Sequence, residues 1–110
     1  MPGSDLYTGS LDLLILKAVS WGPRHGYAIG QWLRQSTSEV ISVQEGALYP
    51  ALHRLERRGL LEEEWGVSET GRDAKFYKLT PDGRKHLKQE LARWQEYTRV
   101  MTLSLLAERP

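Results

Sequence analysis

The chain has 110 residues, and 15 Lys and Arg against 14 Asp and Glu leave a formal net charge of +1. With 40% hydrophobic and 26% charged residues, it has the composition of one globular domain and not of a disordered or fibrous chain. It contains no cysteine, which excludes disulfides and thiolate zinc sites. No apolar stretch approaches the roughly 18 residues of a membrane span, and residues 1–5 lack the features of an export signal, so we expect a cytoplasmic protein without membrane contact.

Neither an active site nor a metal site is predicted. His25, His53 and His86 stand far apart, and no pair of them has metal-ligand spacing. No nucleophile–base pair, carboxylate dyad or phosphate-binding loop occurs at a meaningful spacing. We therefore expect no enzymatic activity, no metal and no cofactor.

Two amphipathic helices are predicted in the first third of the chain. The first begins after Ser10 in the N-cap position and stops before Gly22-Pro23. Its apolar side chains recur at helical spacing: Leu11, Leu14, Ile15, Ala18 and Val19. The second helix spans about residues 25–36, with Ile29, Trp32 and Leu33 on one face. There Gly30 either permits close approach of another helix, which is the favoured interpretation, or is simply tolerated.

A third helix follows a short β-branched stretch, residues 40–43, which we expect to form a brief strand. Ser42 and Glu45 fit a capping box, so the helix should begin just after Ser42. Its apolar stripe consists of Leu48, Ala51, Leu52 and Leu55. Pro50 predicts a bend about one turn earlier, and Gly59 is typical of a helix end.

The second half of the chain predicts a β-hairpin and a long helix. Residues 60–65 and 75–79 have the pattern of two strands joined by a polar turn. Thr80-Pro81 has the residues of a helix start, and the helix should run to about residue 106, roughly 38 Å. That length exceeds what so small a domain needs for its own core.

Three helices, a hairpin and a long helix follow one another in the order of a winged helix-turn-helix protein. We therefore predict a mostly helical α+β fold. Residues 1–80 would form a DNA-binding domain of three helices and a two-stranded wing, and residues 81–110 a C-terminal dimerisation helix. In this fold the third helix enters the major groove, and the wing touches the flanking backbone or minor groove.

An ordered set of short motifs runs through nearly the whole chain. It comprises residues 25–29 (HGYAI), 45–56 (EGALYPALHRLE), 59–61 (GLL), 64–65 (EW) and 75–77 (KFY), with Arg72, Leu79-Thr80 and Gly83. This set resembles the phenolic-acid-decarboxylase regulator (PadR) family of bacterial transcription factors, and the chain length resembles the short subfamily with one C-terminal helix. The resemblance implies a dimeric winged-helix DNA-binding protein, usually a repressor released by a small molecule.

Candidate DNA contacts lie on the third helix. Tyr49, His53 and Arg54 are spaced to lie along one side of it, away from the apolar stripe, and can bind phosphates; Arg54 can also read guanine. Gln44, at the start of the helix, can read a base edge. The alternatives are a half-buried Tyr49 and a solvated His53.

The wing supplies two further candidates. Arg72 and Lys75 flank its expected tip and are predicted to contact DNA, whereas the alternative is an ordinary solvated turn. Glu62, Glu63 and Glu64 would repel phosphates, so we expect them on the far side of the base of the wing.

The last helix carries a heptad-like apolar seam with one polar break. Its members are Leu87, Leu91, Trp94, Thr98, Met101 and Leu105. Because the helix outruns its own domain, this seam predicts a homodimer and not only an intramolecular core. Trp94 lies midway, and the family resemblance implies that paired copies of it sandwich a flat aromatic or phenolic effector. The alternative is that Trp94 only packs the dimer core.

Together these features predict a sequence-specific transcriptional regulator that binds double-stranded DNA. We expect a dimeric repressor on a pseudo-palindromic operator, released by a small aromatic ligand. The alternative is a winged-helix module that binds only protein. Such a module is expected to lack the Tyr49–His53–Arg54 set and a basic wing tip.

Overall fold

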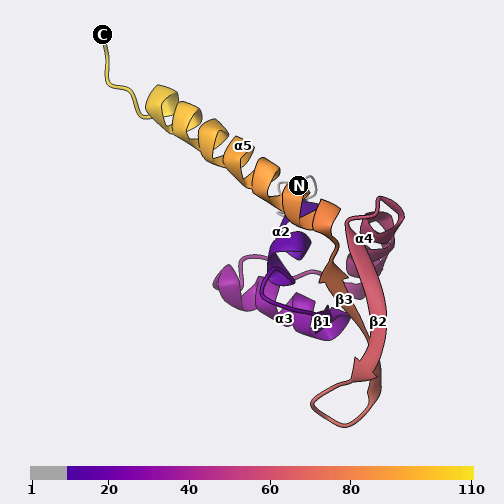
Figure 1. Cartoon of the computed structure of the whole chain (residues 1–110). Coiled ribbons are helices and arrows are strands. Elements are labelled where there is room, and N and C mark those ends of the chain that lie inside the picture. The colour runs from indigo at the N-terminus through magenta and orange to yellow at the C-terminus, as the bar shows by residue number, and fades with distance from the viewer. Residues whose placement is uncertain (1–9) are drawn as a thin grey trace.

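The computed structural model describes residues 10–110, which fold into a helical domain with a wing and a projecting helix (Figure 1). The elements follow in the order α2 (Leu11–Ala18), β1 (Arg24–His25), α3 (Gly26–Ser36), α4 (Glu45–Arg57), β2 (Leu61–Val67), β3 (Asp73–Leu79) and α5 (Pro81–Leu105). The α+β winged-helix prediction is confirmed. Residues 1–5, on which the expectation of no export signal rests, lie outside the described residues.

The core is the space between α2, α3 and α4. The predicted apolar stripes of these helices meet there, joined by Leu16, which the predicted stripe did not include. The largest fully buried side chains are Ile15, Leu16, Val19, Ile29, Leu33, Leu52 and Leu55. Leu61 and Tyr77 close the core from the wing side. Burial of these side chains is the main stabilising term of the domain.

The wing belongs to a three-stranded antiparallel sheet in the order β1-β3-β2. Strand β1 was missed by the sequence patterns, because two residues carry no periodicity. It forms because β3 pairs with it: Arg24 lies opposite Tyr77, and His25 opposite Phe76. His25 also caps α3, because its Nδ1 accepts a hydrogen bond of 3.2 Å from the backbone N–H of Ala28.

The start of α4 corrects two predictions. Residues 40–43 form no strand, and the helix begins at Glu45 with Gln44, not Ser42, at the N-cap. Ser42 is therefore two residues too early for the capping box, and the Glu45 side chain lies outside the described part of the structure. The helix runs uninterrupted through Pro50. Gly59 has φ +74°, as predicted for a helix end.

Strand alternation splits the three acidic residues at the base of the wing. Glu62 and Glu64 share one face, where the Lys78 ammonium lies 3.6 Å and 3.3 Å from their carboxylates. Glu63 points to the other face, toward α4. The expectation that all three lie together on one far side was wrong, because successive strand residues face opposite sides.

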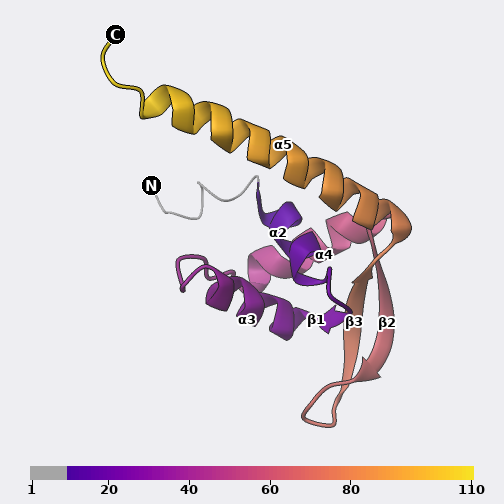
Figure 2. The same ribbon diagram turned by 60° about the vertical axis from the view of Figure 1, so that its left-hand side comes forward.

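Helix α5 begins as predicted and leaves the domain as a long rod (Figure 2). Pro81 is its first residue, and the Thr80 hydroxyl accepts a hydrogen bond of 2.9 Å from the Gly83 N–H. Gly83 is buried and Leu87 packs against the core, so the first two turns belong to the winged domain. None of the helices in the described residues is long and apolar enough to cross a membrane.

Candidate nucleic-acid interface

The predicted contact residues of α4 do not lie on one side of the helix. Tyr49 faces α3, where a Cβ added to Gly26 would stand 2.6 Å from its hydroxyl oxygen. Arg54 faces α2 instead, with its Nη2 atom 2.7 Å from Asp12 Oδ1. Five helical residues turn the side-chain direction by about 140°, which puts Tyr49 and Arg54 on opposite flanks. His53 lies between these two directions.

The close approach that glycine permits is at Gly26 and not at Gly30. At Gly30 an added Cβ would meet only a Leu48 methyl at 3.9 Å, an ordinary contact. The interpretation of Gly30 as the point of close helix approach is therefore wrong. Gly26 opens the space that the Tyr49 ring occupies between α3 and α4.

The outward face of α4 carries one cation that the sequence reading did not select. Gly46, Pro50, His53 and Arg57 recur at helical spacing opposite the buried stripe, and all four are exposed. That cation is Arg57, in the last turn of α4. The spacing from His53 could have identified it as a member of this face.

Two arginines share the carboxylate of Asp12. Besides the contact with Arg54, the Arg58 Nη1 atom lies 3.7 Å from Asp12 Oδ2. The side chains of Arg54 and Arg58 are about half exposed, so these pairs add little stability. Their effect is positional, because they hold Arg54 toward the first turn of α2.

A group of ionisable side chains fills the angle between α4 and the wing. The His53 Nδ1 atom lies 3.5 Å from the Glu56 carboxylate, and the Lys75 ammonium 3.2 Å from that of Glu63. Burial and the adjacent Glu63 carboxyl raise the pKa of Glu56, whereas hydrogen bonds from Glu56 and Lys75 lower the pKa of Glu63. Burial raises the pKa of Tyr77 to about 12. Lys75 is thus already engaged within the wing.

The tip of the wing presents Arg72. Residues 68–72 form a turn in which Gly71 has φ +81° and the Ser68 N–H donates to the Arg72 carbonyl over 2.8 Å. Glycine adopts positive φ at the lowest cost, so Gly71 permits this shape of the tip. Arg72 is exposed, whereas Lys75 also lies 5.8 Å from the exposed Trp65 ring.

Two grooves run along the side of the domain that carries Tyr27 and Tyr49. The larger, of about 570 Å³, lies between α3 and the wing and includes Trp65, Arg72 and Lys75. The smaller, of about 270 Å³, lies between α3 and the start of α4 and includes Gln44. Gly26, Tyr27, Gln31 and Tyr49 line both.

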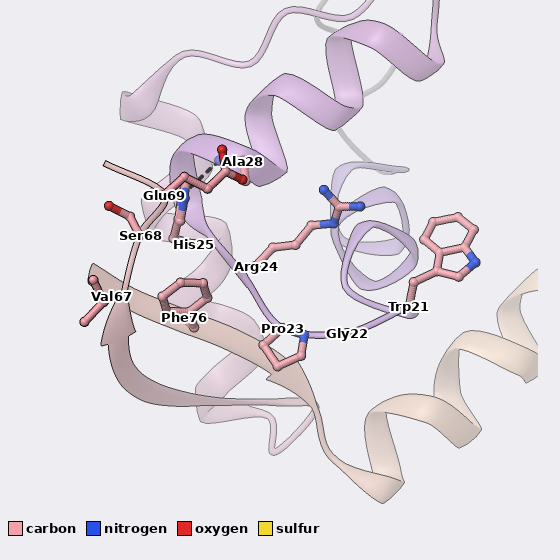
Figure 3. A pocket seen from close by; sticks show the side chains of 10 residues that line it. All are labelled: Trp21, Gly22, Pro23, Arg24, His25, Ala28, Val67, Ser68, Glu69 and Phe76. Atoms are coloured by element: carbon pink, nitrogen blue, oxygen red, sulfur yellow. Dashed lines mark hydrogen bonds between the residues drawn. The ribbon is translucent and has the colours of Figure 1, made fainter. Parts of the chain in front are cut away.

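A third hollow, of about 290 Å³, lies near the turn that precedes β1 (Figure 3). Phe76 and His25 stand in it with ring centroids 5.4 Å apart and planes at 71°. At its other side Trp21 packs on Trp32 at 5.6 Å and under the Lys17 ammonium at 4.4 Å. None of the predicted DNA contacts lines this hollow.

The predicted seam of α5 divides into two parts. Leu87 packs on the core of its own domain, whereas Leu91, Trp94, Met101 and Leu105 are exposed. The Thr98 hydroxyl donates a hydrogen bond of 3.1 Å to the Trp94 carbonyl. The one polar side chain of the seam therefore has its partner within the helix. Trp94 and Tyr97 stack with ring centroids 5.8 Å apart.

Residues 15–89, which include every buried core residue from Ile15 to Tyr77, match the transcriptional regulator PadR-like family. The chain belongs to this family. The resemblance seen in the sequence motifs is thereby confirmed, and the PadR-like chain is a transcriptional regulator.

Similar proteins and similar solved structures support the assignment of this chain to the PadR-like family. It is 42% identical over 71 residues to a transcriptional regulator of Mycobacterium tuberculosis, which covers 64% of this chain and 65% of the relative. A PadR-like regulator of Bacillus cereus is 26% identical with a TM-score of 0.84, over 94% of this chain and 99% of the other. A transcriptional regulator of Clostridium thermocellum is 33% identical with a TM-score of 0.79, over 89% and 95%.

In this PadR-like chain, the predicted DNA contacts thus fall into four places. Gln44 and Tyr49 line the groove between α3 and α4, and Arg72 and Lys75 line the groove beside the wing. His53 lies on the outward face of α4 beside Glu56, and Arg54 pairs with α2. No group of three or more metal-ligating side chains occurs among residues 10–110.

Proposed function

We propose that the protein is a homodimeric repressor that binds a pseudo-palindromic DNA site through α4 and the wing. The observation that carries this proposal is the exposed outward face of α4, with His53 and Arg57, lying beside a wing whose tip presents Arg72. An exposed helix face that carries an arginine and a histidine, beside a second exposed arginine on the wing, favours binding to the DNA backbone and major groove. Gln44 and Tyr49 extend this face toward α3.

The division of labour within the chain is part of the proposal. The winged domain, through residue 80, contacts DNA, and α5 joins two copies. Support for the second part comes from the apolar side chains that α5 leaves exposed beyond its first two turns. They cover several sides of the last turns, where Val100, Leu103 and Leu106 add to the seam. A helix that is apolar on several sides is stable when it is buried.

DNA binding is tested with the wild-type chain, and the role of the wing with Arg72→Ala. We expect the wild-type chain to select inverted half-sites spaced by about 34 Å or a multiple of it, since a two-fold dimer presents two copies of α4. Arg72→Ala should weaken binding to selected and unrelated duplexes by similar factors, because residues on such loops bind mainly phosphates. Fluorescence anisotropy at several salt concentrations measures both effects.

The control for Arg72→Ala is Arg109→Ala, which removes the same charge at an exposed position beyond the end of α5. A loss confined to the selected site would mean that the wing reads sequence or shape. Absence of salt-dependent binding by the wild-type chain would contradict the proposed function and favour a protein-binding module.

The effector is proposed to bind at Trp94. The stacked and half-exposed pair of Trp94 and Tyr97 offers a flat aromatic face on the helix that joins the two copies. A planar aromatic or phenolic guest stacks on such a face, and it releases DNA to the extent that it prefers a different separation of the two copies of α4.

We expect planar dyes to quench the fluorescence of the wild-type protein more than that of Trp94→Leu. The comparison is needed because Trp21, Trp32 and Trp65 also emit. Equal quenching of the two proteins would assign Trp94 to the dimer core alone.

A further inference from the structure

Two carboxyl groups meet in the angle between α4 and the wing, and the proposed function leaves them unassigned. Glu56 belongs to the last turn of α4, and Glu63 belongs to β2 and points toward α4. Their side chains are hydrogen-bonded to each other, and together they are called the carboxyl pair below. An ionised carboxylate has no hydrogen to donate, so this bond requires that one of the two groups carries a proton.

The surroundings place that proton on Glu56. Its side chain is 21% exposed, against 38% for Glu63, and burial disfavours the charged form of a carboxyl group. Burial and then the Glu63 carboxyl raise the pKa of Glu56, and they outweigh the opposite effect of His53 and Lys75. The hydrogen bond from Glu56 and the Lys75 ammonium, 3.2 Å away, lower the pKa of Glu63.

Other charged and titratable groups face the carboxyl pair from α4 and β3. From α4, the His53 Nδ1 atom lies 3.5 Å from the Glu56 carboxylate. From β3, Lys75 is already paired with Glu63, and Tyr77 stays neutral because burial raises its pKa to about 12. Tyr49 faces Tyr77 from α4. Loss of the shared proton therefore leaves two adjacent carboxylates with one ammonium and one imidazole between them.

We propose that this single proton ties the base of the wing to α4, and that its loss to solvent weakens DNA binding. The second part rests on the proposed function. With the proton in place, a hydrogen bond holds the wing and α4, the two elements proposed to contact DNA, in one relative position. Without it, two like charges repel each other across the angle between β2 and α4.

Two physical effects connect the shared proton to DNA affinity, and they have the same sign. A wing that is held less firmly loses more conformational entropy when it binds. An ionised Glu56 also adds negative charge beside His53 and Arg57 on the outward face of α4, which opposes contact with phosphates. DNA affinity should therefore fall as the pH rises through the range in which Glu56 loses its proton.

The first test uses the free protein. In a carbon-13 NMR titration of the carboxyl groups, we expect Glu56 to titrate above the ordinary glutamate value of about 4.3, and Glu63 below it. A raised carboxyl pKa means that the folded chain holds the proton more tightly than the unfolded chain, so Glu56 lowers stability as the pH rises above about 4.3. Glu56→Gln keeps a hydrogen-bond donor without the charge. In urea unfolding it should match the wild type at about pH 4 and be more stable at about pH 7.

The second test measures DNA binding by fluorescence anisotropy. At about pH 7.5, Glu56→Gln should bind about fivefold more tightly than the wild type, as for the gain of one ordinary hydrogen bond. The difference should shrink as the pH falls toward about 4.5, where the wild-type pair regains its proton. Glu64→Gln is the matched control, because it removes the same charge from β2 on the opposite face, where Glu64 pairs with Lys78 at 3.3 Å. It should keep the pH profile of the wild type.

The outcomes separate this inference from the proposed function. Ordinary titration of both carboxyl groups, or equal stability of Glu56→Gln and the wild type at neutral pH, overturns the shared proton whatever the DNA result. Equal DNA binding by Glu56→Gln and the wild type overturns its effect on affinity, and so do equal gains for Glu56→Gln and Glu64→Gln, which would be an effect of net charge alone. Failure of the wild-type chain to bind duplex DNA overturns the proposed function and the effect on affinity together, while the first test still decides whether the proton ties the wing to α4. Circular dichroism shows that each variant is folded.

Discussion

Replacing Gly83 with alanine is expected to lower the free energy of unfolding by at least about 3 kcal/mol, the upper part of the range for overpacked sites. The added Cβ would collide with the Leu60 carbonyl group and stand 3.2 Å from a Leu79 methyl. The Leu60 oxygen belongs to the backbone, so no side-chain rotation relieves the clash. Helix α5 would have to move as a whole.

That movement breaks the joint between α5 and the corner that follows α4. The Thr80 N–H donates to the Leu60 carbonyl at 3.2 Å, and the Thr80 hydroxyl donates to the Gly59 carbonyl at 2.6 Å. The joint therefore fixes the direction in which α5 leaves the domain. In the proposed dimer, a shift there changes the distance between the two copies of α4.

Gly46→Ala is the matched control for Gly83→Ala. Both glycines lie in the first turn of a helix, but an added Cβ at Gly46 meets nothing within 4 Å. Since alanine is favoured over glycine in helices by about 1 kcal/mol, this control should be neutral or stabilising. Urea unfolding at one fixed protein concentration measures both, because dimerisation makes stability depend on concentration. Equal stability of Gly83→Ala and the wild type would contradict the claim that close packing at Gly83 holds α5 against the domain.

The elements predicted correctly are those with strong local signals. Thr80-Pro81 marks the start of α5 and Gly59 the end of α4, because a side-chain cap and a positive φ depend on few neighbours. The apolar stripes of α2, α3 and α4 were recognisable because helical periodicity persists over several turns.

The elements that were missed depend on distant partners. Strand β1 exists only because β3 pairs with it, and residues 40–43 stay unpaired despite their β-branched side chains. The cap of α3 is an imidazole, a group that no common capping rule selects. In each case tertiary contacts decide the local structure.

The site residues illustrate the same limit. Spacing alone placed Arg54 with Tyr49, but only the packing of α2 against α4 brings Asp12 to Arg54. Likewise, the alignment of Tyr27 with Tyr49 across one groove arises from the crossing of α3 and α4 at Gly26. Residues on two helices meet through a glycine whose role the sequence pattern does not reveal.

The largest functional effect is expected from Leu91→Glu combined with Met101→Glu. Both side chains are exposed in the single chain, at 43% and 37%, so the substitutions should leave the winged domain folded. In a dimer built on the seam, they would bury like charges without partners, which costs about 3–5 kcal/mol for each buried charge. We expect dissociation at micromolar protein and loss of binding to a two-half-site operator. Leu87 is kept unchanged because it packs on its own core.

The control adds the same two charges away from the seam. Gln89→Glu with Ala92→Glu changes exposed positions on the opposite side of α5 and should leave the dimer intact. Sedimentation velocity gives the oligomeric state, and anisotropy with one and two half-sites gives DNA binding. A monomeric double variant Leu91→Glu, Met101→Glu that still binds a single half-site with the same affinity as the wild-type protein would show that the winged domain and the dimer helix act as separate units. A variant that stays dimeric contradicts the assignment of the seam, because no stable interface accepts four unpaired buried carboxylates.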